Sequence, residues 1–174
     1  MKYFLVESDK KYTDAPFLID WFQKIRIENI EKGRSHLLPQ RLVLPIRSNK
    51  DTVFIDVIFF PFLLVTETVR KVIAMYEPKT IFKQIALLDG KFEKTELYHL
   101  PILEKMNCEL KKGQLVTEIE LEYSKIKEKT IFQFTYQNST YTVMRLDILE
   151  SILRRGARGL SIIPLQVRGE AEDE

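Results

Sequence analysis

The sequence has very few residues that support covalent catalysis or metal binding. Its 174 residues include one cysteine, Cys108, and two histidines, His36 and His99. A single cysteine excludes an intrachain disulfide and a cysteine-based zinc site. The two histidines lie far apart in the sequence and show no metal-ligand spacing. The sequence therefore gives no reason to expect a metal ion or another cofactor.

The common catalytic and nucleotide-binding motifs are also missing. The chain contains no G-x-S-x-G, G-x-x-x-x-G-K-S/T, G-x-G-x-x-G, H-E-x-x-H or C-x-x-C sequence. A catalytic triad is defined by geometry rather than by sequence order, so a cryptic hydrolase stays open as an alternative. Neither histidine has a neighbouring sequence that indicates an activated serine. We therefore predict a protein that binds rather than catalyses.

Long apolar segments are absent as well. The most apolar run is "VIFFPFLLV", residues 57–65, which is far shorter than the roughly 20 residues of a membrane-spanning helix. The apolar part of the first ten residues, "MKYFLVESDK", is shorter than the core of a signal peptide, which has about 7 to 15 residues. We therefore predict a cytoplasmic protein that does not bind membranes.

The chain lacks a large excess of charge of either sign. It has 27 basic and 25 acidic residues, which leave a formal net charge of +2. Nucleic acids and anionic membranes attract proteins through a concentrated basic field. The bulk charge therefore predicts neither partner, and any site for a polyanion would have to be local.

What the sequence does have is the composition of a globular protein, with 45% hydrophobic and 30% charged residues. We predict a single domain over residues 1–174. Its core is expected over 51–168, with a less well-defined N-terminal part over 1–50 and a disordered acidic tail over 169–174.

The first of two similar segments follows the apolar run. "FLLV", residues 62–65, predicts a buried strand, and Thr66 is a suitable N-cap for a helix with one apolar face. The apolar positions of that helix are Val69, Val72, Ile73 and Tyr76. Two further strands are predicted in "TIFKQIALLDG" and "TELYHLPIL".

The second segment has the same order of elements. "TIFQFTYQNSTYTVMRL" predicts two strands about a turn at Gln137-Asn138-Ser139, and a helix precedes the strand "LSIIPLQV". The two strand-helix-strand units predict an α+β fold, with a mixed or antiparallel sheet and a few helices packed on it. An internal duplication and a recurrent topology explain the repetition equally well. The predicted apolar positions of the second helix are Ile148, Leu149, Ile152 and Leu153.

An acidic row lies between the two units, in "GQLVTEIELEYSKIKEKT". Glu118, Glu120 and Glu122 alternate with apolar residues, which is the period of a strand with one acidic face. Such a face is either simply exposed to water or directed at a basic partner protein. We treat the three glutamates as candidate partner-binding residues.

A basic turn, "ILRRGARGL", follows the second helix. Arg154 and Arg155 complement the negative end of that helix, and Gly156 suits the left-handed position after it. Nucleic acid can use such arginines as phosphate contacts, which makes a nucleic-acid-associated accessory protein an alternative function. No aromatic residue interleaves with the arginines to stack on bases, so nucleic acid is the less favoured partner.

Helix termination does not require a third arginine, Arg158. An acidic patch on a partner protein, or the acidic tail, would explain the excess of positive charge. Arg154, Arg155 and Arg158 are therefore candidate partner-binding residues. Trp21 and Tyr98 are candidate aromatic anchors for the same kind of partner.

The order of these segments resembles the Imm-eleven-type immunity proteins of bacterial polymorphic toxin systems, a group first described as a domain of unknown function. The resemblance extends over about residues 51–163. It implies a small cytosolic protein that neutralises a cognate toxin by binding it, and it implies no active-site residue. The residues that carry it are structural: Thr66-Glu67 at the strand-to-helix entry, Ile131-Phe132 in a strand, and Arg155-Gly156 to Gly159-Leu160 at the helix exit.

Overall fold

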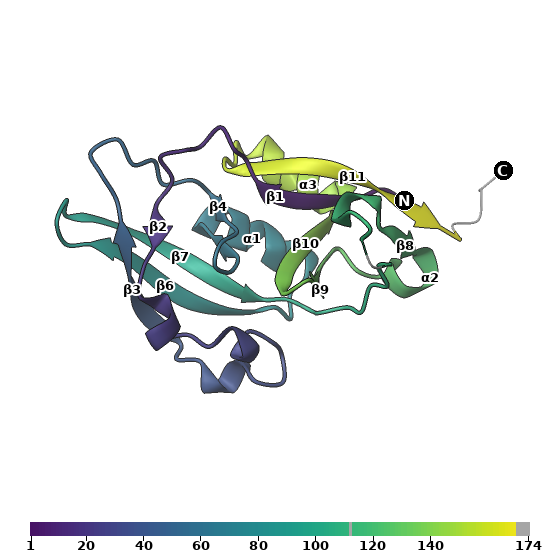
Figure 1. Cartoon of the computed structure of the whole chain (residues 1–174), viewed down its shortest axis with the longest axis horizontal. Helices are drawn as coiled ribbons and strands as arrows, with labels where there is room; N and C mark the ends of the chain where they lie inside the picture. Colours follow the sequence, from purple (N-terminus) through teal and green to yellow (C-terminus); the bar gives the residue numbers. More distant parts are fainter. Residues whose placement is uncertain (112, 170–174) are drawn as a thin grey trace.

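The computed structural model describes residues 1–111 and 113–169, so all of the predicted acidic tail except Gly169 lies outside the described residues. The chain forms two curved mixed sheets with helices packed against them (Figure 1). The predicted α+β class is confirmed. The N-terminal fifty residues also contribute to the interior, because Tyr3, Leu5 and Leu44 are completely or almost completely buried.

The strands of the first sheet lie in the order β8 (Glu120–Glu122), β11 (Leu160–Arg168), β1 (Tyr3–Ser8), β10 (Ser139–Arg145), β9 (Ile131–Tyr136). Those of the second lie in the order β2 (Phe17–Leu18), β3 (Arg41–Arg47), β6 (Ile81–Asp89), β7 (Lys94–Ile102), β5 (Leu64–Val65), β4 (Val57–Ile58). The α-helices are α1 (Glu67–Tyr76), α2 (Tyr123–Ile126) and α3 (Leu146–Arg154). Single 3-10 turns are η1 (Trp21–Gln23), η2 (Ile27–Asn29), η3 (Ser35–Leu37) and η4 (Val116–Glu118).

The two sheets repeat one connectivity. In each, a hairpin leads into a helix, and the strand after the helix is parallel to the strand before it, with one antiparallel strand between them. We call each sheet together with its helix one half of the molecule. The hairpin is β4–β5 in the half that contains α1 and β9–β10 in the half that contains α3. The strand after the helix also pairs, in parallel, with a strand that precedes the hairpin, β3 in one half and β8 in the other.

The intervening antiparallel strand comes from different parts of the chain in the two halves. In the second sheet it is β7, which directly follows β6. In the first sheet it is β1, from the beginning of the chain. The correspondence therefore covers five strands and a helix in each half, well beyond the strand-helix-strand units that the sequence predicts.

Helices α1 and α3 contact each other and bury their apolar faces in a core shared by the two sheets. Val69, Val72 and Ile73 are buried on α1 at the predicted spacing. On α3 the predicted positions are buried except Leu153, which is 41% exposed, so the assignment of Leu153 to the core is wrong.

The apolar run 57–65 is a hairpin rather than one strand starting at Phe62. Val57 and Ile58 pair with Val65 and Leu64, and residues 59–63 form the loop between them. The hairpin places Phe60 in a loop where its ring is 62% exposed. The turn of the other hairpin is formed by Gln137 and Asn138, both with positive φ, while Ser139 already belongs to β10.

Asp56 connects the two halves. Its backbone N–H donates to the carbonyl of Arg158 at 2.9 Å, and its Oδ2 accepts from the backbone N–H of Arg158 at 2.8 Å. Thr66, the residue before α1, donates to the same aspartate from its backbone N–H and from its hydroxyl, each at 3.0 Å. The hydroxyl of Thr66 therefore does not cap its own helix, contrary to expectation, but holds Asp56.

We expect Gly159→Ala to lower the free energy of unfolding by about 3 kcal/mol or more. Gly159 has φ +99°, and a Cβ there would lie 2.6 Å from Cδ1 of Ile55 and 2.9 Å from the carbonyl oxygen of Val57. Gly156→Ala is the matched control, because Gly156 also has positive φ but no atom within 4 Å of the added Cβ. Its cost should be about 1–2 kcal/mol. Urea denaturation measures both free energies of unfolding. Equal losses of stability in the two variants would contradict the close packing of Gly159 on Ile55 and Val57.

Candidate functional site

The basic turn has partners within the protein. Arg154 forms an ion pair with Glu150 at 3.2 Å, one helical turn earlier. The guanidinium of Arg155 donates to the backbone carbonyl and the hydroxyl of Ser151, each at 2.7 Å, and so serves the C-terminal end of α3. Arg158 lies against Asp56, with 3.9 Å between Nε and Oδ2. All three arginines thus contribute to the end of α3 or to the contact between the halves.

The acidic row is not one face of a strand. Glu118 belongs to the 3-10 turn η4, where its Oε2 accepts from the backbone N–H of Leu115 at 3.2 Å. Only Glu120 and Glu122 lie on β8, which has three residues, and α2 follows immediately. The prediction of a strand carrying all three glutamates on one face is therefore wrong.

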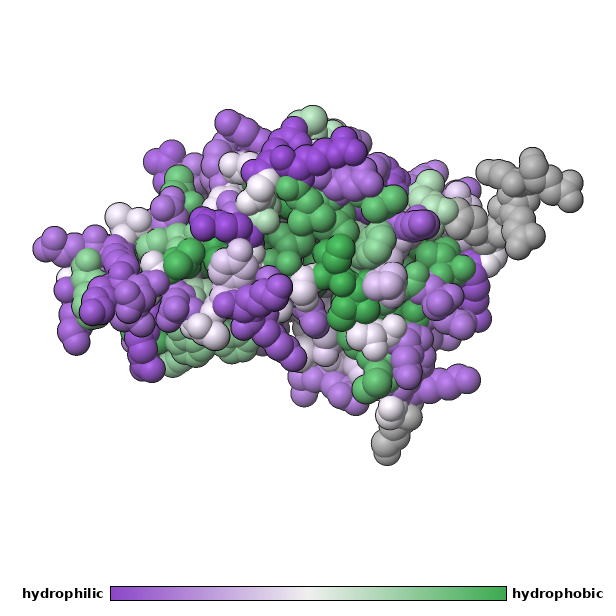
Figure 2. Space-filling view, turned by 90° about the horizontal axis from the view of Figure 1, so that it is seen from above, coloured by the Kyte–Doolittle hydropathy of each residue, from purple (hydrophilic) through white to green (hydrophobic). Residues whose placement is uncertain are grey.

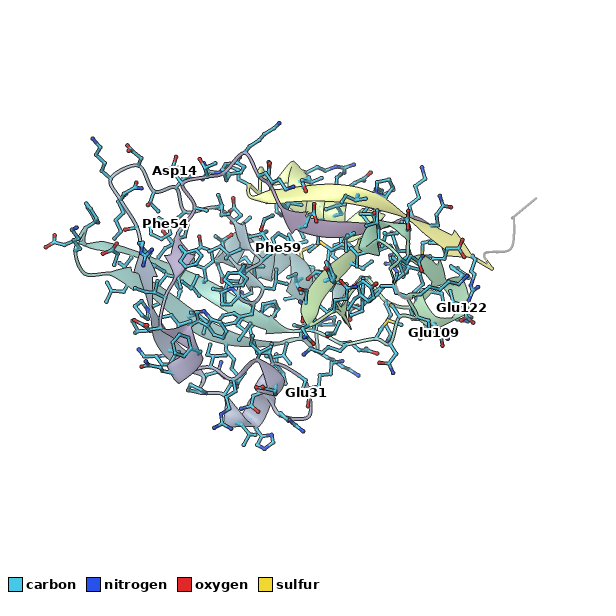
Figure 3. All side chains as sticks on the ribbon, in the orientation of Figure 1. Asp14, Glu31, Phe54, Phe59, Glu109 and Glu122 are labelled. Atoms are coloured by element: carbon cyan, nitrogen blue, oxygen red, sulfur yellow. The ribbon has the colours of Figure 1, made fainter. Side chains whose placement is uncertain are left out.

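Glu122 lies at the end of the molecule where β11 ends, as the label in Figure 3 shows. Its carboxylate is 2.7 Å from Nζ of Lys125, and the hydrogen bond from this lysine lowers the pKa of Glu122. Glu120 is exposed and has no ion pair among the described residues. With Glu118 and Glu122 engaged locally, the row offers one free carboxylate rather than a continuous acidic surface.

His99 is the buried histidine, with 5% of its surface exposed. It lies on β7 beneath α1, where Nε2 is 2.8 Å from Oε2 of Glu67, although the two groups are not aligned for a hydrogen bond. Burial lowers the pKa of His99, and Glu67 opposes this effect while Arg70 adds to it. Phe82 packs against the imidazole edge. The surroundings are those of a structural histidine in a helix-sheet interface.

We expect the protein to lose stability as the pH falls below about 6.5, the ordinary pKa of histidine, because the unfolded chain then binds a proton at His99 more readily than the native protein. His99→Gln should reduce the fall in the free energy of unfolding between pH 7.5 and 5.5. The exposed His36 provides the control variant His36→Gln. Denaturant titrations at several pH values measure how steeply the free energy of unfolding depends on pH in each variant. A slope for His99→Gln as steep as that of the parent protein would contradict the depressed pKa.

An exposed aromatic cluster lies where β2, η1 and the β4–β5 loop meet. The rings of Phe17 and Phe60 stack at 6.2 Å between centroids, with 53% and 62% of their surfaces exposed. Phe22, also 62% exposed, meets Trp21 edge to face at 5.9 Å. Trp21 in turn meets the buried ring of Phe62 at 5.8 Å. We call Phe17, Trp21, Phe22 and Phe60 the aromatic patch.

Buried contacts hold the patch in place. Leu18, next to Phe17, is almost completely buried, and β2 pairs with the end of β3 at Ile46 and Arg47. Arg47 and Asp20 line the hollow beside the patch together with its aromatic rings. Ordered aromatic rings next to an arginine have the composition of protein-binding hot spots.

Apolar side chains are exposed elsewhere on the surface as well, but they do not form a cluster of aromatic rings. Figure 2, seen from the side on which β1 and β11 lie in Figure 1, shows apolar residues across the middle of the face and hydrophilic residues at both ends. The other exposed apolar side chains include the aliphatic residues Val43, Leu88, Leu97 and Ile162. The aromatic patch is distinguished by ring-to-ring contacts between its members.

Sequence reasoning found one member of the patch, Trp21, and missed three. Tyr98, the other predicted anchor, is fully buried and donates from its hydroxyl to the carbonyl of Ile55 at 2.6 Å, so its assignment as an interface anchor is wrong. Two aromatic-rich sequences, "FLIDWF" and "FFPF", are the signal that was available. The strand predicted from the second of these begins at Phe62, and hydropathy alone does not indicate that Phe60 is exposed.

No protein-family model matches the chain, and no curated protein matches its sequence. Within residues 1–111 and 113–169, no group of three or more His, Cys, Asp or Glu side chains is arranged to hold a metal ion. In the same ranges no helix has both the length and the apolar character needed to cross a membrane.

Proposed function

We propose that this protein is a non-enzymatic, cytoplasmic immunity protein that neutralises a cognate bacterial toxin by binding it, with the aromatic patch at the centre of the interface. The observation that carries the proposal is the exposure of three phenylalanine rings, each in ring contact with another member of the aromatic patch. The resemblance of residues 51–163 to immunity proteins of polymorphic toxin systems supports a bacterial toxin as the partner.

The geometry of the patch favours tight binding for two reasons. Aromatic rings bury a large apolar area while losing few side-chain rotamers, so little entropy is lost on association. Trp21 connects the exposed rings to Phe62 in the interior, which fixes the patch before a partner arrives. A preformed apolar centre with Arg47 at its rim is the arrangement in which few residues supply most of the binding energy.

The alternatives have less support. Arg154, Arg155 and Arg158 each have a partner within the protein, so a nucleic acid would have to compete for them. A hydrolase would need an activated nucleophile, and His99 is buried between β7 and α1, where it faces Glu67 and packs against Phe82. No specific observation favours either function over protein binding.

Co-expression tests the proposal. The chain should restore growth of bacteria that express the toxin domain encoded beside its gene, and the two proteins should purify as a complex. Phe60→Ala should weaken the complex about 30-fold, since a hot-spot residue contributes about 2 kcal/mol. Isothermal titration calorimetry on the purified pair measures the change.

Phe92→Ala is the matched control. Phe92 is a 40% exposed phenylalanine in the turn between β6 and β7, where Lys91 lies over its ring, and it does not belong to the aromatic patch. Its replacement should leave the affinity unchanged. The free energies of unfolding of both variants should lie within about 0.5 kcal/mol of that of the parent protein. A toxin that remains lethal in the presence of this chain, or a Phe60→Ala variant with undiminished affinity, argues against the proposal.

A further inference from the structure

A groove next to the aromatic patch separates the two hairpins of the repeated fold. Its volume is about 360 Å³, within the range of roughly 300–1,000 Å³ typical of small-molecule sites. The loop between β4 and β5 and the hairpin β9–β10 both line it. Phe59, labelled near the middle of the molecule in Figure 3, belongs to the first of these.

Most of the lining is apolar. The β4–β5 loop supplies Phe59, Phe60 and Leu63, and Trp21 and Leu100 add to the same lining. Several of these side chains belong to or pack against the interior, so the apolar wall is part of the fold. This wall suits an aromatic or branched aliphatic body.

The polar lining comes from the β9–β10 hairpin and Lys105, and two of its residues are buried. Gln133 and Thr142, which are only 6% and 3% exposed, are joined by a hydrogen bond of 3.1 Å from Gln133 Nε2 to Thr142 Oγ1. Because Oγ1 of Thr142 accepts this bond, the hydroxyl proton of Thr142 remains as a donor, and it makes no hydrogen bond to another described residue. The groove therefore offers a fixed hydroxyl donor beside its apolar wall, which suits an acceptor atom of a ligand.

One cation completes the site. Lys105 forms an isolated parallel bridge with Gln133, which places the two side chains on the same side of the sheet. Lys105 is the only charged residue among the described residues that line the groove, and its ammonium group has no ion pair with any described residue. One ammonium beside a neutral hydroxyl donor matches a single negative charge, because a dianion would keep an uncompensated charge against the apolar wall.

We infer that this groove binds an apolar monocarboxylate. The carboxylate accepts hydrogen bonds from Lys105 and from the hydroxyl of Thr142, and the apolar body packs on the rings of Trp21 and Phe59. The inference does not depend on the immunity function, because it concerns a small ligand and different polar residues.

The sole tryptophan of the chain, Trp21, lines the groove and reports on its occupancy by fluorescence. The probe is 3-phenylpropionate, and the neutral comparison is 3-phenylpropionamide, which has the same apolar body. We expect saturable binding of the acid, seen in Trp21 fluorescence and in saturation-transfer NMR, and about tenfold weaker binding of the amide. Lys105→Gln should lower the affinity for the acid to the affinity that the parent protein has for the amide.

Lys127→Gln is the matched control, since Lys127 is an exposed lysine that does not line the groove. It should keep the preference for the acid. The inference is overturned if the acid shows no saturable binding at millimolar concentration, if acid and amide bind equally to the parent protein, or if Lys105→Gln retains the preference. Lys105 is exposed, so its replacement leaves the fold intact.

Discussion

The hydrogen bonds of Asp56 are the constraint on which the arrangement of this protein depends. One aspartate receives the N–H and hydroxyl of Thr66 at the start of α1 and exchanges hydrogen bonds with Arg158 between α3 and β11. The start of α1 and the turn after α3 are thereby joined, and Gly159 allows this turn to approach Ile55 closely enough for the exchange. Because a half-buried carboxylate that loses several such partners is destabilising, these hydrogen bonds hold the two halves together at this point. The shared core between α1 and α3 forms with the halves held in this way.

This constraint also explains the basic turn. The sequence indicates correctly that Gly156 follows a helix in a left-handed conformation and that Arg155 serves the helix end. Nearby residues do not explain Arg158, whose contact is with Asp56, roughly a hundred residues earlier in the chain: its backbone exchanges hydrogen bonds with Asp56, and its guanidinium Nε lies 3.9 Å from Oδ2. Helix termination is a local property and can be predicted from nearby residues. A contact between distant loops depends on how the halves are arranged, which no local pattern encodes.

The same distinction separates what could be predicted of the fold from what could not. The apolar spacing of Val69, Val72 and Ile73 predicts α1, and the turn at Gln137 and Asn138 predicts the second hairpin, because periodicity and turn chemistry are local. The full repeat was hidden, since the strand equivalent to β7 in the other half is β1, at the opposite end of the chain. The exposure of Phe60 was hidden for a related reason. An apolar run folded into a hairpin has a loop, and hydropathy alone does not reveal which residues occupy it.

The candidate sites arise where the two halves differ. The hairpins β4–β5 and β9–β10 occupy equivalent places in the repeated connectivity, but residues 59–63 form an apolar aromatic loop in one, and Gln137 and Asn138 form a tight polar turn in the other. The longer loop reaches the surface with Phe60 and so completes the aromatic patch with Phe17. The second hairpin brings Thr142 beside Gln133, and both hairpins line the groove. A repeated architecture thus supplies the rigid framework, while the divergence of two equivalent hairpins supplies one apolar and one polar wall, which is the combination that selective binding requires.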